Sequence, residues 1–154
     1  MSGTSDLQRL IDESAIRDLT AAYSDAVTHL DALRAAAVYA EDGRVVVMGQ
    51  ETRGRAAIEQ GMRETFAAFE LLQLIAHAPR INLDGDRAQA RWSTVELTVR
   101  RGAAHFGVIM GRYEDRLVRE GSVWRFRERV FTMAGRMQMP IDKLQTHAGF
   151  FGLG

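Results

Sequence analysis

The most informative absence in this chain of 154 residues is cysteine, which does not occur. Without a thiol, the chain cannot form disulfide bonds, thiolate nucleophiles or cysteine-ligated zinc and iron–sulfur centres. The four histidines also provide no pair at the i and i+4 spacing with which a helix binds a metal, so we expect no metal site.

An excess of one charge and a long apolar run are absent as well. Twenty basic residues balance 20 acidic ones, so no global field attracts nucleic acid or an anionic membrane. No apolar stretch approaches the roughly 18 residues that span a bilayer, and residues 1–19 contain no apolar signal core. We therefore expect a cytoplasmic protein that has neither a nucleic acid nor a membrane as its partner.

The composition that remains is typical of one globular domain. Hydrophobic residues make up 46% of the chain and charged residues 26%. A domain of this length buries roughly 70% of the surface that its unfolded chain exposes. The chain is therefore long enough to form a core and an internal pocket.

The first half of the sequence is predicted to be mainly helical. Residues 5–22 form a helix because apolar residues recur in it at helical spacing, and this pattern extends to Leu30 with a break near 28–31. A second, short helix over 31–43 ends at Gly43. A strand follows over 44–49, where three valines are consecutive, and then a third helix over 53–69.

The second half is predicted to form two β-hairpins. The first joins residues 79–83 to 87–101 through the turn "DGD", and the second joins 104–120 to 123–136 around "EGS". This order of elements, α-α-β-α-β-β-β-β, predicts an α+β fold with helices on one face of an antiparallel sheet. The tail after Arg136 contains Phe150 and Phe151, which either plug an opening or serve a partner.

Four stretches carry a resemblance to a known family: "IRDLTAAYSDAVTHLDALRAAAVYAEDGRVVV", "RGRAAIEQGMRETF", "HAPRINLDGDRAQARW" and "GRYEDRLVREGSVWRFRERV". Their order and spacing resemble the SnoaL-like branch of the nuclear transport factor 2-like superfamily, which includes polyketide cyclases and bile-acid dehydratases. The resemblance implies a cone-shaped α+β barrel, in which a curved, mostly antiparallel sheet wraps around the N-terminal helices and encloses a pocket. We expect one such domain over residues 1–154, with a core at about 5–135 and a tail at 136–154 that either covers the pocket or serves a partner.

Three residues are candidates for catalysis. His77 resembles the family's general base, and an imidazole moves protons near neutral pH. Glu96 resembles the acid that follows a Trp on the equivalent strand, and strand alternation places it on the same face as Trp92 and Thr94. Tyr23 resembles a family Tyr that hydrogen-bonds a substrate carbonyl or an oxyanion.

Each candidate also has a structural interpretation. His77 can be a loop or core histidine that is bonded to a backbone carbonyl. Glu96 can reach solvent or pair with Arg100 on the same strand, and Tyr23 can be a core residue of an apolar helix face. The main departure from the family is Thr28, which occupies the place of the Asp that pairs with the His in many catalytic members, so Glu96 is the remaining candidate for that acid.

The remaining pocket candidates are drawn from several segments. Arg129 resembles a family Arg on the last strand, although its alternation with Arg125 and Arg127 also fits one solvent-exposed face. The residues that we expect to line the pocket are Thr28, Phe66, Trp92, Thr94, Met110 and Arg129.

These features lead to three hypotheses. The first is a cofactor-independent dehydratase, isomerase or cyclase that acts next to a carbonyl of a small apolar substrate. The second is a protein that binds an apolar ligand without turning it over. The third is a structural subunit, as in the small subunits of ring-hydroxylating dioxygenases. The resemblance further suggests a homodimer, while a trimer would fit the third hypothesis better.

Overall fold

The computed structural model describes residues 2–143, with side chains described from residue 5 onward. The helices are α1 (Ser2–Thr28), α2 (Ala32–Ala37), α3 (Arg55–Ala67) and the short 3₁₀ helix η1 (Ile141–Lys143). The strands are β1 (Tyr39–Val47), β2 (Gln50–Arg53), β3 (Phe69–Ala76), β4 (Arg80–Asp84), β5 (Arg87–Arg100), β6 (His105–Glu120) and β7 (Val123–Pro140).

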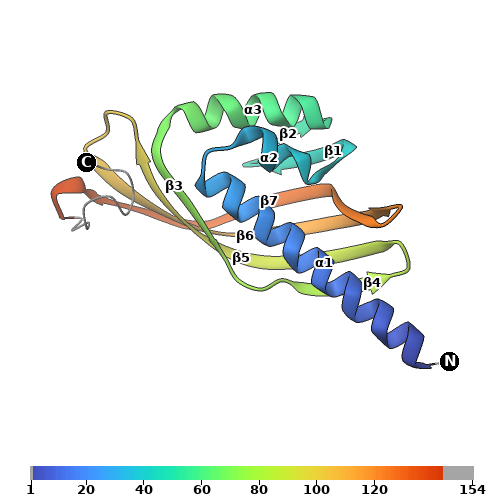
Figure 1. The fold of residues 1–154 in the computed structure, drawn as a ribbon. Helices are drawn as coiled ribbons and strands as arrows, with labels where there is room; N and C mark the ends of the chain where they lie inside the picture. The colour runs from blue at the N-terminus through green and yellow to red at the C-terminus, as the bar shows by residue number, and fades with distance from the viewer. Residues whose placement is uncertain (1, 144–154) are drawn as a thin grey trace.

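The seven strands form one curved sheet that does not close on itself (Figure 1). The strand order is β2-β1-β7-β6-β5-β3, and β4 pairs with the first part of β5. All pairs are antiparallel except β1 with β7. The helices and the mostly antiparallel sheet confirm the predicted α+β class.

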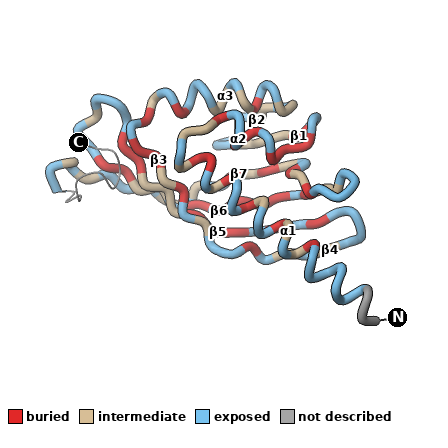
Figure 2. Tube along the Cα trace, viewed as in Figure 1, coloured by how far each residue is buried: buried red, intermediate tan, exposed pale blue. Residues whose placement is uncertain are grey.

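Helix α1 crosses the inner face of the sheet and contributes much of the core (Figure 1). Ile16, Tyr23 and Val27 are buried at a spacing of seven and four residues, which places them on one side of the helix. The N-terminal turns leave this core, and Leu10 there is 64% exposed. Buried residues accordingly concentrate where the helices cross the strands (Figure 2).

The C-terminal end of α1 is attached to the edge strand β3. The backbone N–H of Leu74 donates a hydrogen bond to the Thr28 hydroxyl over 3.2 Å. Leu30 then adopts a left-handed backbone conformation with φ of 54°, and the Asp31 carboxylate caps α2 by accepting the N–H of Arg34. The predicted break near residues 28–31 is therefore a real end of the helix.

Three parts of the element prediction were wrong. The second helix ends at Ala37 instead of Gly43, because Tyr39 pairs with Phe126 of β7 and enters the sheet. Strand β2 was not predicted, since its sequence "QETR" has no apolar alternation. Strand β3 was also missed because Leu71 and Leu72 are both buried, one on each face, so the period of two is hidden.

The first residues of the predicted tail belong instead to the last strand of the sheet. Residues 136–140 continue strand β7, and Ile141 begins η1 with its N–H bonded to the carbonyl of Ala104. Phe150 and Phe151 lie outside the described residues. Among residues 2–143, no helix is both long enough and apolar enough to cross a membrane.

Candidate functional site

The inner face of strand β5 is the centre of the candidate site. Its first residues alternate between exposed and buried as predicted, with Ala88, Ala90, Trp92 and Thr94 buried. Glu96 continues this face and is partly buried, while Arg100, the partner that it might have taken, lies instead over the ring of Phe69. The strand therefore presents a carboxyl group at the border of the core.

A buried ion pair lies deeper in the cone. The Arg129 guanidinium donates to both carboxylate oxygens of Asp115, from Nε to Oδ1 over 3.0 Å and from Nη2 to Oδ2 over 3.1 Å. The indole N–H of Trp92 donates to Oδ2 of the same carboxylate over 2.6 Å. Burial raises the pKa of the Asp115 carboxyl, while these charged and neutral donors favour its ionised form.

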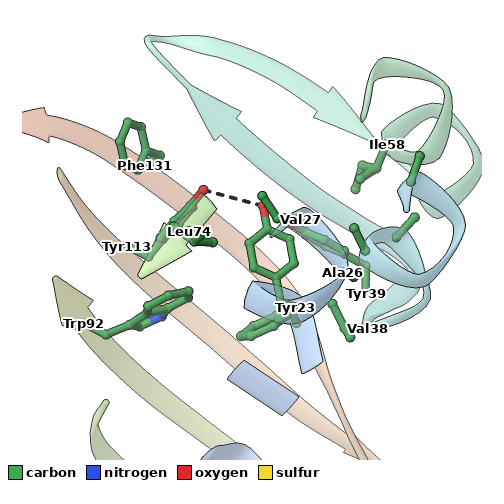
Figure 3. Close-up of a cluster of buried hydrophobic side chains, with 14 of the residues drawn as sticks. Tyr23, Ala26, Val27, Val38, Tyr39, Ile58, Leu74, Trp92, Tyr113 and Phe131 are labelled. Atoms are coloured by element: carbon green, nitrogen blue, oxygen red, sulfur yellow. Dashed lines mark hydrogen bonds between the residues drawn. The ribbon is translucent and has the colours of Figure 1, made fainter. Parts of the chain in front are cut away.

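Aromatic rings enclose the guanidinium of Arg129. Its Cζ atom lies between 3.9 and 4.7 Å from the centroids of four rings, which belong to Phe126, Tyr23, Tyr113 and Trp92. The Tyr23 and Tyr113 hydroxyls are 3.5 Å apart (Figure 3). These side chains fill the interior beside α1, so Tyr23, Trp92 and Arg129 belong to a packed core.

A β-bulge places Arg129 in this core, and the interpretation of a solvent-exposed arginine face was wrong. In the register of β6 with β7, Leu117 pairs with Phe126 but the preceding Arg116 pairs with Glu128, so Arg127 is an extra residue. Such an insertion exchanges the faces of the residues that follow it. Phe126 and Phe131 lie five residues apart and are both buried, and this odd spacing was the signal for a bulge.

Glu96 is the side chain in the site that is best suited to proton transfer. It pairs in register with Leu74 of β3 and with Ile109 of β6, both of which pack in the main core. No hydrogen bond or ion pair to its carboxylate occurs within the part of the chain that the structure describes. Burial therefore raises its pKa from 4.5 to about 7.

The structure does not bring His77 to the face that carries Glu96. Leu74 and Ala76 lie opposite Glu96 and Thr94, so the next residue, His77, takes the other side by strand alternation. His77 is exposed, and its backbone N–H bonds to the carbonyl of Ser93. Strand alternation therefore argues against the predicted pairing of His77 with Glu96 across one pocket, and the pairing stays a prediction.

Of the two remaining lining candidates, Met110 lies elsewhere. Met110 pairs with Val95 on the outer face of the sheet and is 46% exposed. Phe66 is buried at the end of α3 and lines a surface hollow of about 500 Å³ beside the turn that joins α1 to α2. Met110 therefore does not share the face of Glu96, whereas Phe66 also packs in the main core, together with Leu74.

Some buried polar atoms near this face are unpaired. Among the described residues, the Tyr39 hydroxyl, the Thr94 hydroxyl and Nη1 of Arg129 have no hydrogen-bond partner. Thr94 is two residues before Glu96 on the same strand face. The same part of the chain contains no group of three or more histidine, aspartate or glutamate side chains that could hold a metal ion.

The fold and this site define a class: a cone-shaped α+β domain that carries a partly buried carboxyl group beside an aromatic core. The family profile of the SnoaL-like domain matches residues 8–130. The chain belongs to the SnoaL-like domain family. No curated protein matches it.

Solved structures share this fold across nearly the whole chain. A type 2 hexachlorocyclohexane dehydrochlorinase (LinA) is 16% identical with a TM-score of 0.84, and the match covers 94% of this chain and 99% of that one. A scytalone dehydratase-like protein from Novosphingobium aromaticivorans is 19% identical with a TM-score of 0.80, covering 94% and 100%. A nuclear transport factor 2-like protein with a cystatin-like fold from the same species is 26% identical with a TM-score of 0.73, covering 85% and 87%.

Proposed function

We propose that the protein is a cofactor-independent enzyme in which Glu96 moves a proton on a carbon atom next to a carbonyl group of a small apolar substrate. The observation that carries this proposal is the position of Glu96, an unpaired carboxyl group between Leu74 and Ile109 on the inner face of the sheet. A carboxyl group in such surroundings titrates close to neutral pH and can both accept and return a proton.

The neighbouring groups suit this chemistry. Glu96 takes the proton as a carboxylate and delivers it as a carboxylic acid, which supports isomerisation, cyclisation or elimination of a leaving group. The Thr94 hydroxyl, which is unpaired among the described residues, supplies a hydrogen bond for a substrate oxygen. Leu74 and Ile109 contribute an apolar contact surface beside these polar groups.

Elimination is the reaction that the structural neighbours favour. A dehydrochlorinase removes hydrogen chloride and a dehydratase removes water, and proteins described by each of these names share this fold. Both reactions need a base that removes a proton from carbon. We assign this base to Glu96 and not to His77, which follows the end of β3 and is exposed.

Deuterium exchange tests the proton-transfer step without knowledge of the natural substrate. A panel of apolar cyclic ketones, beginning with cyclohexanone, is incubated with the protein in D₂O, and loss of the α-proton signal is followed by NMR. We expect exchange with an inflection near pH 7, and a loss of about 10²- to 10⁴-fold in Glu96→Gln. Exchange that is equal in the wild type and in Glu96→Gln would refute the proposal.

Two matched variants complete this experiment. Glu70→Gln makes the same chemical change at an exposed position of β3 and should leave exchange unchanged. His77→Gln should also retain exchange, because His77 is exposed and the proposal assigns the base to Glu96. Loss of exchange in His77→Gln alone would return the general-base role to histidine.

A second candidate function is ligand binding without turnover. It is favoured by Thr28, whose hydroxyl accepts the Leu74 N–H and so takes a structural role where many catalytic family members carry an Asp. Binding of the same ketones with no deuterium exchange would support this candidate.

The homodimer also stays a prediction. Three apolar side chains on the outer face of the sheet, those of Ile75, Met110 and Met137, are about half exposed, and a second copy would pack there. Sedimentation equilibrium tests this prediction.

A further inference from the structure

The largest hollow that we describe lies away from the aromatic core. It has a volume of about 710 Å³ and is lined mainly by side chains of β4, β5, β6 and β7 that point away from α1, with Arg9 of α1 at its border. Its charged lining residues include Arg9, Arg80, Arg91, Arg116, Glu114 and Glu128. We call this hollow the outer groove.

The acidic side chains of the outer groove are already occupied. Glu128 accepts from Arg44 over 2.7 Å and lies 3.7 Å from Arg116, while Glu114 lies 3.4 Å from Arg112. A third acid in the lining, Asp115, binds Arg129 in the core. These carboxylates are therefore satisfied by arginines other than Arg80 and Arg91.

Arg80 and Arg91 remain without a carboxylate partner among the described residues. They are direct cross-strand neighbours in the register of β4 with β5, and Glu114, which lies opposite Arg91 on β6, is in ion-pair contact with Arg112. The Cβ atoms of such pairs are about 4.5–5.5 Å apart, and like charges at this distance are destabilising. An anion between the two guanidinium groups would remove the repulsion and gain charge-assisted hydrogen bonds from both.

From this arrangement we infer that the outer groove binds a small molecule through an oxyanion group, a phosphate or a carboxylate, which is held between Arg80 and Arg91. The volume of the groove leaves room for the rest of a small molecule beyond the oxyanion. The site lies on the opposite side of the sheet from Glu96, so it is independent of the proposed reaction.

Titration with inorganic phosphate, and separately with succinate, tests this site. Each anion is added to the wild-type protein at constant ionic strength, with sodium chloride as the balancing salt. The backbone amide and arginine side-chain N–H signals are followed by NMR. We expect saturable shifts at Arg80 and Arg91 with at least one of the two anions, and the preferred anion identifies phosphate or carboxylate as the ligand group.

Three single variants and one double variant decide whether the arginine pair is responsible. Arg80→Gln and Arg91→Gln should each weaken binding at least tenfold, and each should fold normally because both side chains are exposed. Arg136→Gln removes the same charge from an exposed position of β7 outside the groove and should leave the affinity unchanged. The inference is overturned by shifts that also appear with chloride, by binding that survives the Arg80→Gln/Arg91→Gln double change, or by an equal loss in Arg136→Gln.

Discussion

The charge of Glu96 should cost folding stability at neutral and alkaline pH, and replacing this residue by glutamine should recover it. Burial raises the pKa of Glu96 from 4.5 to about 7, so the folded protein holds this proton more tightly than the unfolded chain does. Each unit of difference corresponds to about 1.4 kcal/mol, which gives roughly 3 kcal/mol for the complete displacement. Because the side chain stays partly exposed and solvent screens its charge, we expect about 1 to 2 kcal/mol.

The sign of the effect follows from proton binding. Below pH 4.5 the carboxyl group is protonated in both states, and Glu96→Gln should then be as stable as the wild type. Between pH 4.5 and 7 the unfolded chain loses the proton first, so the wild type loses stability relative to the variant. Above pH 7 the advantage of Glu96→Gln should be complete and constant.

Urea unfolding at a series of pH values measures this difference. Subtracting the wild-type free energy of unfolding from that of Glu96→Gln cancels the titration of all other groups. Glu70→Gln, at an exposed position of β3, is the control and should show a difference that does not depend on pH. A free-energy difference for Glu96→Gln that stays flat from about pH 4 to pH 8 would refute the reasoning.

The remaining predictions concern the core and two glycines. Asp115→Asn leaves the Arg129 guanidinium buried without a counter-charge, so the free energy of unfolding should fall by about 3–5 kcal/mol in urea; a loss below about 1 kcal/mol would contradict the buried pair. Gly111→Ala places a methyl group against the ring of Phe131 and should cost about 1–3 kcal/mol in the same assay. Gly61→Ala meets no atom within 4 Å in α3 and should instead stabilise the protein by about 0.5–1 kcal/mol, which a rise in the thermal midpoint would verify.

The sequence predicted those parts of the fold that depend on a repeating pattern. The two long hairpins follow from turn residues between alternating strands, and β5 buries Trp92 and Thr94 on the face that its alternation indicated. The class of fold also followed, since helices precede long antiparallel strands. In each case a local period of two or of 3.6 residues carries the information.

The candidate site was predicted less completely because it depends on local breaks in those periods. The bulge at Arg127 turns Arg129 into the core, and no strict alternation predicts that. His77 follows β3, whose period is hidden by burial on both faces, so its side could not be derived. The partner of Arg129 is Asp115, fourteen residues away on β6, and only the register of the hairpin brings them together.

The most direct test of the central claim is the titration of the Glu96 carboxyl carbon by NMR in protein labelled with ¹³C-glutamate. The signal is assigned by its loss in Glu96→Gln and followed from about pH 3 to pH 9. An apparent midpoint near 7 is expected if Glu96 is the acid–base group that we propose. A midpoint near 4.5, the value of an exposed glutamate, would contradict the account.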